Sequence, residues 1–262
     1  ENIYSKTIKQ LKKCNYFLIN FYPDNPFVFW NGNSNKEVLN SLPYYDYFLS
    51  WSRLLIPILN TAGAKNVYYF PFAYDKDIYE KDIKLSKLDF NKYKSDICFI
   101  GTWEKEREIW LENLLEKMSN LNLVIYGNLW KENLNKNSIL RKFLKSNAVY
   151  KDELLKIFKT SKIVLNFIRK QNYSSHNMRT FEVPATESFL LTQRTQEQAE
   201  FLFKEGENIE CFSSVKELVQ KIKFYLKNEE LRKAIAKKGK QRAKEFELRI
   251  VLKKFMEYIH KN

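Results

Sequence analysis

Residues 162–192 constrain the fold of this chain more than any other stretch. They begin with a short apolar run at 163–167, whose length and β-branched side chains predict a strand. A polar loop at 169–177 is followed by a segment of helical character at 178–187 and a second apolar run at 189–191. Strand, loop, helix and strand is the order of a βαβ unit, which predicts an α/β fold with a parallel sheet.

The loop of this unit has the chemistry of an anion-binding site. Ligands of open α/β sheets bind outside the carboxyl ends of the strands, where loops lead into helices. Backbone N–H groups and the helix dipole near Asn177 favour a phosphate, and Arg179 adds a planar fork of donors. Glu182, about one turn later, could accept hydrogen bonds from a pentose. These residues predict a nucleotide site; the alternative is that Asn177 only caps the helix and Glu182 is solvated.

The pattern Asn177-x-Arg179-x-Phe181-Glu182-x-x-Ala185, followed by an apolar strand, resembles a known family segment. It is similar to the nucleotide-sugar-binding segment of group 1 glycosyltransferases of the CgeB-like (spore maturation protein) type. The resemblance extends in the same order over roughly residues 67–242. The other matching segments are 69–73, 95–102, 125–127, 161–166 and 231–239.

The resemblance implies a GT-B architecture, in which two Rossmann-like domains are present and the second holds most of the donor. It implies a hexosyltransferase-like enzyme that moves a sugar from a nucleotide-diphosphate sugar to an acceptor, with retention of the anomeric configuration. No essential metal or other cofactor is expected. The expected partners are the nucleotide sugar and a glycan, lipid-linked or protein acceptor, as in the synthesis of a surface glycan.

The alternation of strands and helices divides the chain into two domains. Residues 1–73 hold three βα steps, about half of a Rossmann-type sheet, so we expect this first domain to be truncated at its N-terminus. Residues 74–94 are expected to connect it to a complete second domain at 95–245, and the helix at 246–262 to pack back toward the first domain. Six strands are predicted in the second domain, at 96–100, 123–126, 148–150, 163–167, 189–191 and 209–212, with intervening helices that include 137–145 and 196–203.

Right-handed βα crossovers would bring the loops after these strands to one edge of the sheet. Gly101 would let the backbone approach a diphosphate that Lys105 and Arg107 could neutralise. Gly127 is expected to allow the same close approach of the backbone. For each glycine alone, the alternative is a simple turn. Tyr150 either flanks the base by stacking or belongs to the core. The predicted donor-binding residues are Gly101, Thr102, Arg107, Tyr126, Gly127, Tyr150, Ser175, Asn177, Arg179 and Glu182.

For catalysis we predict Arg179, Glu182 and His176. The resemblance implies that Arg179 and Arg107 stabilise the leaving diphosphate in place of a metal ion and that Glu182 holds the ribose. His176 is a candidate general acid, with a structural or phosphate-binding role as the alternative.

The sequence departs from the wider group in two places. Ser174 stands eight positions before Glu182, where that group has a glutamate, and Thr186-Glu187 replaces a small Cys-Gly pair. These departures favour the alternative of a non-catalytic nucleotide-sugar-binding or scaffold protein with the same fold.

The formal net charge of +14 raises the question of an anionic partner. The lysines are scattered, much of the excess lies in the last 50 residues, and no helix-turn-helix, RRM or zinc-finger signature is present. Nucleic acid is therefore the least favoured partner, whereas a peripheral contact with an anionic membrane remains an alternative.

Metal and disulfide chemistry are weakly represented in the sequence. Asp75-Lys76-Asp77 is a D-x-D triplet, but it lies in the charged connection, so we predict no metal site. Cys14, Cys98 and Cys211 lack metal or disulfide spacing, so we expect reduced and mostly buried thiols. No stretch reaches the ~18 apolar residues of a membrane span. We therefore predict a cytoplasmic protein, with the inner membrane face as a peripheral location.

Overall fold

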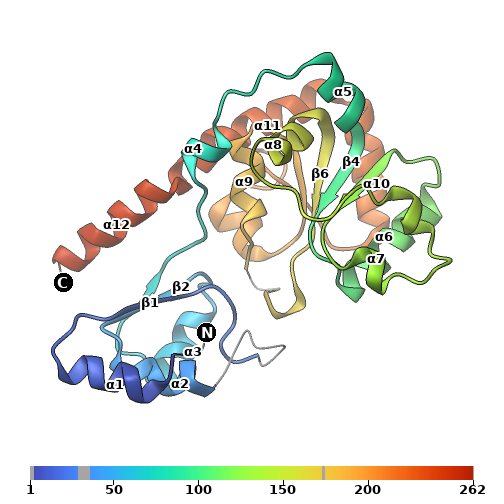
Figure 1. Cartoon of the computed structure of the whole chain (residues 1–262). Coiled ribbons are helices and arrows are strands. Elements are labelled where there is room, and N and C mark those ends of the chain that lie inside the picture. Colours follow the sequence, from blue (N-terminus) through green and yellow to red (C-terminus); the bar gives the residue numbers. More distant parts are fainter. Residues whose placement is uncertain (1–2, 29–35, 173–174, 262) are drawn as a thin grey trace.

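The computed structural model describes residues 3–28, 36–172 and 175–261. These residues form two parallel sheets, each flanked by helices, and the chain crosses between the two lobes twice (Figure 1). The α/β class and the parallel sheets predicted from the sequence are confirmed.

The N-terminal lobe contains a sheet of three strands in the order β1-β2-β3. Its core is built from aromatic and aliphatic side chains that include Phe48, Trp51 and Leu59, all of them buried. The elements of this lobe are α1 (Ser5–Lys13), β1 (Ile19–Tyr22), α2 (Lys36–Ser41), the 3-10 turn η1 (Leu42–Tyr44), β2 (Tyr47–Ser50), α3 (Leu55–Thr61) and β3 (Val67–Tyr69).

The C-terminal lobe contains a larger sheet in the order β5-β4-β6-β7-β8. Its strands are β4 (Ser95–Ile100), β5 (Leu123–Tyr126), β6 (Ser161–Asn166), β7 (Leu190–Gln193) and β8 (Glu210–Phe212). The order reverses between β4 and β6: β5, which follows β4 in the chain, pairs with one edge of β4, whereas β6, β7 and β8 are added one after another on its opposite edge. Such a reversal opens a crevice at the carboxyl ends of the strands.

Side chains alternate between two helical layers on this sheet, as the period of a strand requires. Ile97 and Phe99 of β4 face one layer, formed by α6, α10 and part of α11, whereas Cys98 and Ile100 face the other, formed by α8 and α9. The helical elements are α6 (Lys105–Lys117), α7 (Trp130–Asn133), η2 (Ile139–Phe143), α8 (Lys151–Thr160), η3 (Lys170–Asn172), α9 (Arg179–Ala185), the π-helix η4 (Glu197–Leu202), α10 (Val215–Lys227) and α11 (Glu229–Ala243).

The sixth strand predicted at 148–150 is wrong, and the described part of this sheet has five strands. The outer edge of β5 is already used by the preceding segment. The Lys145 N–H donates to the carbonyl of Ile125 at 3.0 Å, and the Gly127 N–H donates to the carbonyl of Ser146 at 3.2 Å. The helix predicted at 137–145 is accordingly only the 3-10 turn η2, because the chain must extend to reach that edge.

The connection contains α4 (Lys76–Tyr79) and α5 (Lys87–Tyr93), and the chain returns through η5 (Lys244–Phe246) and α12 (Leu248–Lys261). The two crossings lie side by side, because the Tyr74 N–H donates to the carbonyl of Phe246 and the Leu248 N–H donates to that of Tyr74. Val251 and Phe255 of α12 pack in one cluster with Tyr47 and Leu49 of β2 in the N-terminal lobe.

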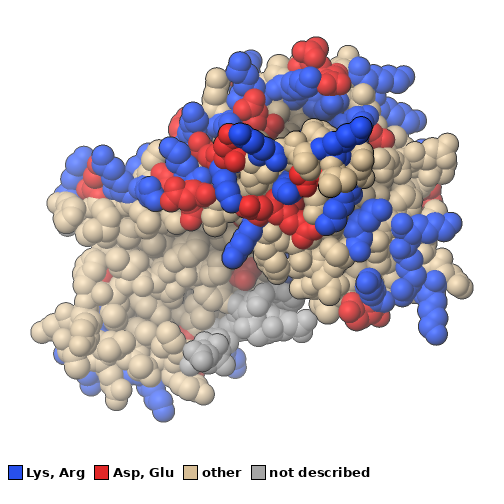
Figure 2. All heavy atoms as spheres, turned by 45° about the horizontal axis from the view of Figure 1, so that its top comes forward, with Lys and Arg blue, Asp and Glu red and all other residues tan. Residues whose placement is uncertain are grey.

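Several remaining features concern charge and sulfur. The three thiols are free and mostly buried, as predicted: Cys98 and Cys211 are buried, and Cys14 is exposed where α1 ends. On the face shown in Figure 2, acidic side chains lie among the basic ones. Asp75 caps α4 and Asp77 pairs with Arg249 at 2.7 Å. Within the described residues, no helix is long and apolar enough to cross a bilayer.

Candidate functional site

A cavity of about 370 Å³ lies at the carboxyl ends of β4 and β6, where the strand order reverses. Most of its wall comes from the C-terminal lobe, and three residues from the N-terminal part of the chain, Pro23, Asp24 and Phe72, complete it. The lining residues are Pro23, Asp24, Phe72, Phe99, Ile100, Gly101, Thr102, Arg107, Asn166, Arg169, Asn172, Asn177, Met178 and Arg179.

Two glycines bring the loops after β4 and β5 into direct contact behind this cavity. Gly127 has a φ of +148°, and a Cβ atom there would lie 2.0 Å from the carbonyl oxygen of Gly101. The Trp130 indole N–H donates to that same oxygen at 2.8 Å. A side chain at Gly101 would meet Phe99 at 2.9 Å. Gly127 therefore requires glycine for the close approach of the two backbones, whereas a Cβ at Gly101 would meet only side-chain atoms.

Arg107 is held in the cavity wall by its own loop. It is 9% exposed, and its guanidinium donates to the carbonyl of Thr102 at 2.6 Å. Burial, together with the positive charges of Arg169 and Arg179, lowers its pKa to about 10, so the group stays charged at neutral pH. Lys105, which was expected to act beside it, pairs with Glu108 at 2.6 Å and does not line the cavity.

The loop after β6 is fixed by a pair of asparagines. The Asn166 amide donates to Asn177 Oδ1 at 3.1 Å, and the Asn177 amide donates back to Asn166 Oδ1 at 3.0 Å. The side chain of Asn177 therefore holds the loop rather than capping α9, whose N-cap position is Met178. The helix has only seven residues and ends at Ala185, earlier than predicted, so its dipole contributes less than the sequence suggested.

Three polar atoms of the lining residues are buried and make no hydrogen bond to any described residue. They are Nε of Arg107, Nε of Arg179 and Oδ1 of Asn172. Buried polar groups in folded proteins nearly always have a partner, and those that lack one point to a bound water, ion or ligand. Two of these three atoms are guanidinium donors, so the missing partner is an acceptor, such as a phosphate.

Glu182 lies behind Arg179 and does not line the cavity. One carboxylate oxygen pairs with Arg179 on the preceding turn, and the other accepts a hydrogen bond from the Tyr79 hydroxyl at 2.6 Å. The structure therefore joins Arg179 and Glu182 in an ion pair but places only Arg179 at the cavity, so ribose binding by Glu182 stays a prediction; it adds Tyr79, which no local sequence signal identified.

His176 and Ser175 are fully buried at the junction of the two lobes. The Phe72 N–H donates to His176 Nε2 at 3.1 Å, so the proton of this neutral ring is on Nδ1, 2.9 Å from the Ser175 hydroxyl. Burial lowers the pKa of His176 to about 3. Trp51 and Phe181 pack edge-on against the ring. Ser174, at the position of the absent glutamate, lies outside the described residues.

The two predicted tyrosines lie away from the cavity. Tyr126 ends β5 and is buried, which raises its pKa to about 12. Tyr150 occupies the N-cap position of α8 and is 68% exposed, so it does not belong to the core. Stacking of a base on Tyr150 stays a prediction.

Sequence reasoning missed the cavity residues Asp24, Phe72, Asn166, Arg169 and Asn172. Arg169 and Asn172 lie in the polar loop that the sequence did single out, and Asn166 ends the strand before it. Those positions could have been included on topology alone. Asp24 and Phe72 come from outside the C-terminal sheet, and no pattern near them indicates this contact.

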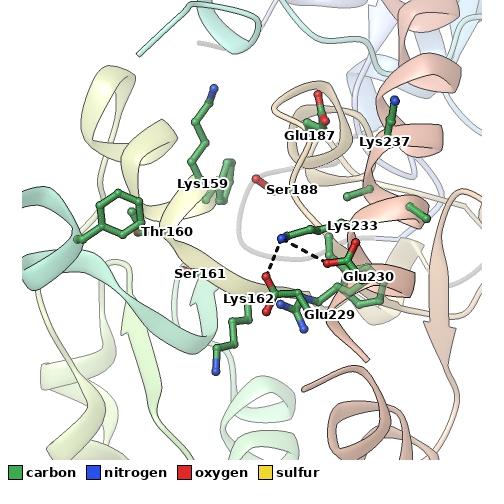
Figure 3. A pocket seen from close by; sticks show the side chains of 16 residues that line it. Lys159, Thr160, Ser161, Lys162, Glu187, Ser188, Glu229, Glu230, Lys233 and Lys237 are labelled. Carbon is green, nitrogen blue, oxygen red and sulfur yellow. Dashed lines mark ion pairs between the residues drawn. The ribbon is translucent and has the colours of Figure 1, made fainter. Parts of the chain in front are cut away.

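A second cleft, of about 810 Å³, lies at the amino edge of the C-terminal sheet (Figure 3). Lysines gather there, but Lys233 pairs with Glu229 at 2.7 Å, and Lys162 pairs with Asp96 at 2.7 Å. No described residue of its lining has a buried polar atom without a partner. The larger cleft therefore lacks the convergent, unsatisfied donors of the smaller one.

A family model described as glycosyl transferase-like matches residues 106–256, more than half of the chain. No curated protein matches the chain in sequence. The matched region contains β5 to β8 and the Arg179–Glu182 pair, but it begins after Gly101.

Solved structures with the same arrangement of both lobes are glycosyltransferases. A sucrose-phosphate synthase from Thermosynechococcus elongatus has a TM-score of 0.70 at 13% identity, covering 98% of this chain and 71% of that one. HepE from Anabaena in complex with UDP-glucose has a TM-score of 0.75 at 12% identity, covering 98% of this chain and 77% of HepE. A glycosyltransferase from Rickettsia africae has a TM-score of 0.68 at 14% identity, covering 97% of this chain and 79% of that one. These likenesses confirm the predicted GT-B fold.

Proposed function

Because the chain belongs to the glycosyl transferase-like family, we propose that it moves a sugar from a nucleotide-diphosphate sugar to an acceptor. The observation that carries this proposal is the pair of guanidinium groups, Arg107 and Arg179, that line one cavity and whose buried Nε atoms make no hydrogen bond within the described residues. Two arginine forks on one side of a cavity suit the oxygens of a diphosphate. HepE, with the same fold, is described in complex with UDP-glucose.

The arginines provide the electrostatic part of the proposed mechanism. When the bond between sugar and diphosphate breaks, negative charge grows on the leaving oxygen, and fixed positive groups lower the barrier. Within the described residues, no cluster of three metal-ligand side chains is present, so we assign this task to Arg107 and Arg179 without an essential metal. Retention of the anomeric configuration, implied by the family resemblance, is part of the same proposal.

We assign His176 a positioning role. Its pKa of about 3 leaves no extra proton to donate at neutral pH, and both ring nitrogens already have partners. His176 lies in the loop before Arg179 and contacts Phe72 and Trp51 from the N-terminal part of the chain. These contacts fix the distance between the two lobes at the place where the sugar would lie. Asp24 lines the same cavity from the N-terminal lobe; one of its oxygens accepts from the Gln171 amide at 2.9 Å, and the other is suited to accept hydrogen bonds from sugar hydroxyls.

A glycan, lipid-linked or protein acceptor would approach from the N-terminal lobe, beside Pro23 and Asp24. We propose a cytoplasmic location, with peripheral contact at the inner membrane face through basic helices such as α12.

Calorimetric titration with UDP, GDP and their sugars tests the donor site. We expect saturable binding of one nucleotide, weakened about tenfold by Arg179→Lys, because lysine keeps the charge but loses the fork. Arg249→Lys is the control, since Arg249 pairs with Asp77 on the surface. Absence of binding to every nucleotide would refute the proposal.

Release of UDP from UDP-glucose then separates an enzyme from a scaffold. We expect slow hydrolysis that Arg179→Lys abolishes and Arg249→Lys leaves unchanged. Tight binding without turnover, with or without sugar acceptors, would instead identify a non-catalytic nucleotide-sugar-binding protein.

A further inference from the structure

A network of polar side chains leads from the cavity wall back to the π-helix η4. Asn166 and Asn177, which line the cavity, form its front. The Asn166 amide also donates to the Thr192 hydroxyl at 2.9 Å, and the Thr180 hydroxyl donates to Gln198 Oε1 at 2.7 Å. Thr180, Thr192 and Gln198 are fully buried, so their polar groups need partners within the protein.

Gln198 is the centre of this polar network. Its carbonyl oxygen accepts from Thr180 and, at 3.4 Å, from Thr192. Its amide nitrogen donates to the carbonyl of Gln193 at 3.0 Å and to the Thr195 hydroxyl at 3.2 Å. A glutamine amide has two donors and an oxygen with two lone pairs, and all of them are used here. An apolar residue of similar length would therefore break every one of these hydrogen bonds.

The direction of these hydrogen bonds is determined at the back of the network. The Thr195 hydroxyl donates its proton to the carbonyl of Ser175 at 2.6 Å, so it can only accept from Gln198. Gln198 must then direct its oxygen at Thr180, whose hydroxyl accepts from the Asn177 N–H at 3.4 Å. The network therefore holds the loop at 175–180 at both of its ends.

The amides of the cavity wall have no proton left for a ligand. Those of Asn166 go to Asn177 and Thr192, and those of Asn177 go to Asn166 and to the carbonyl of Phe167 at 3.2 Å. An anion in the cavity would therefore bind the guanidinium of Arg179, two positions after Asn177, rather than these amides. The network acts on the anion only by fixing the loop that leads into Arg179.

We propose that Gln198 is a positioning residue of the anion site, which fixes through Thr180 and Thr192 the loop that directs Arg179 into the cavity. This inference rests on the proposed function, because it takes the anion to be the diphosphate of the donor. It gives a role to η4, although no residue of η4 lines the cavity. Such π-helical turns are rare and are frequently found at functional sites.

Thr180→Val removes the hydroxyl and keeps the shape of the side chain, and Thr180→Ser restores the hydroxyl. Thr160→Val is the matched control, because Thr160 is also buried and its hydroxyl donates to the carbonyl of Lys156 in its own helix at 2.7 Å, away from the cavity. Calorimetry measures the affinity for UDP or GDP, whichever binds, and competition measures the affinity for the matching nucleoside. We expect Thr180→Val to lower the ratio of diphosphate to nucleoside affinity about tenfold, or about 1.4 kcal/mol. Thr180→Ser and Thr160→Val should keep the wild-type ratio.

Gln198→Met tests the centre of the network. We expect it to lower the same ratio at least about tenfold. Adding Thr180→Val to this variant should cause no further loss, because both changes remove one shared interaction. Fully additive losses would overturn the inference. If Gln198→Met does not fold, the Thr180 variants decide alone.

The outcomes separate this inference from the proposed function. If wild type binds UDP or GDP and Thr180→Val keeps the full ratio, the inference is wrong and the nucleotide site stands. An equal loss of diphosphate and nucleoside affinity, or no recovery in Thr180→Ser, would leave the hydroxyl only a structural role and would also overturn the inference. If wild type binds no nucleotide, the proposed function fails and this inference fails with it.

Discussion

Replacing Gly127 with alanine would place a methyl group inside the backbone of the neighbouring loop. The added Cβ atom would lie 2.0 Å from the carbonyl oxygen of Gly101 and 3.2 Å from the amide nitrogen of Thr102, so both loops must move. Overpacking of this kind costs about 1–3 kcal/mol. The φ of +148° adds roughly 1–3 kcal/mol of backbone strain. We expect Gly127→Ala to destabilise the protein by about 2–6 kcal/mol.

Gly206→Ala separates these two contributions. Gly206 also has a positive φ, +78°, but a Cβ atom there would approach nothing closer than 3.8 Å. Gly206→Ala should therefore lower the free energy of unfolding only by the cost of backbone strain, about 1–3 kcal/mol. Urea unfolding of both variants measures the difference, and UDP titration reports on the loop. Equal destabilisation of the two variants, or unchanged nucleotide affinity in Gly127→Ala, would refute the argument that loop contact shapes the cavity.

Three further changes test charge and packing elsewhere. The hydrogen bond from Arg194 is the largest cause that lowers the pKa of Glu217, from 4.5 to about 2. The ionised Glu217 therefore stabilises the fold above about pH 4.5, and this stabilisation is lost as the pH falls toward 2. The Tm advantage of wild type over Glu217→Gln should shrink between these two pH values. Burial raises the pKa of Glu197 and outweighs the lowering effect of its neighbours Ser175, Tyr69 and Arg53, so Glu197→Gln should raise the Tm at pH 8, with a gain that fades on acidification. Phe255→Ala should cost about 3–5 kcal/mol in urea unfolding, whereas the exposed Met256→Ala should cost under about 0.5 kcal/mol.

The C-terminal fold was predictable because its strands are short apolar runs covered on both faces. The run at 163–167 overlaps the observed β6, Ser161–Asn166, and the following helix and strand appear in the predicted order. The failure at 148–150 has a tertiary cause. A three-residue apolar run fits a strand equally well whether or not a sheet edge is free, and here residues 144–146 occupy that edge.

The candidate site was predictable only where topology determines it. Gly101, Arg107, Asn177 and Arg179 each follow a strand of one parallel sheet, so their convergence follows from the direction of the strands. The contact of Tyr79 with Glu182 depends on how the connection packs across α9, and a pattern of local periodicity contains no information about that packing.

The burial of Arg107 is itself an argument that the cavity binds an anion. Its side chain packs near the Phe99 ring and is almost removed from water, although desolvation opposes its charge and lowers its pKa to about 10. An apolar residue of similar length would fill the same space without that cost. Glu104, the nearest carboxylate, is 3.5 Å away and is shared with Arg169, so the charge is incompletely balanced within the described protein. Positions that break the local rules of stability are where binding sites are expected, and a diphosphate oxygen would give Arg107 Nε the hydrogen bond that it does not make with Glu104 at 3.5 Å.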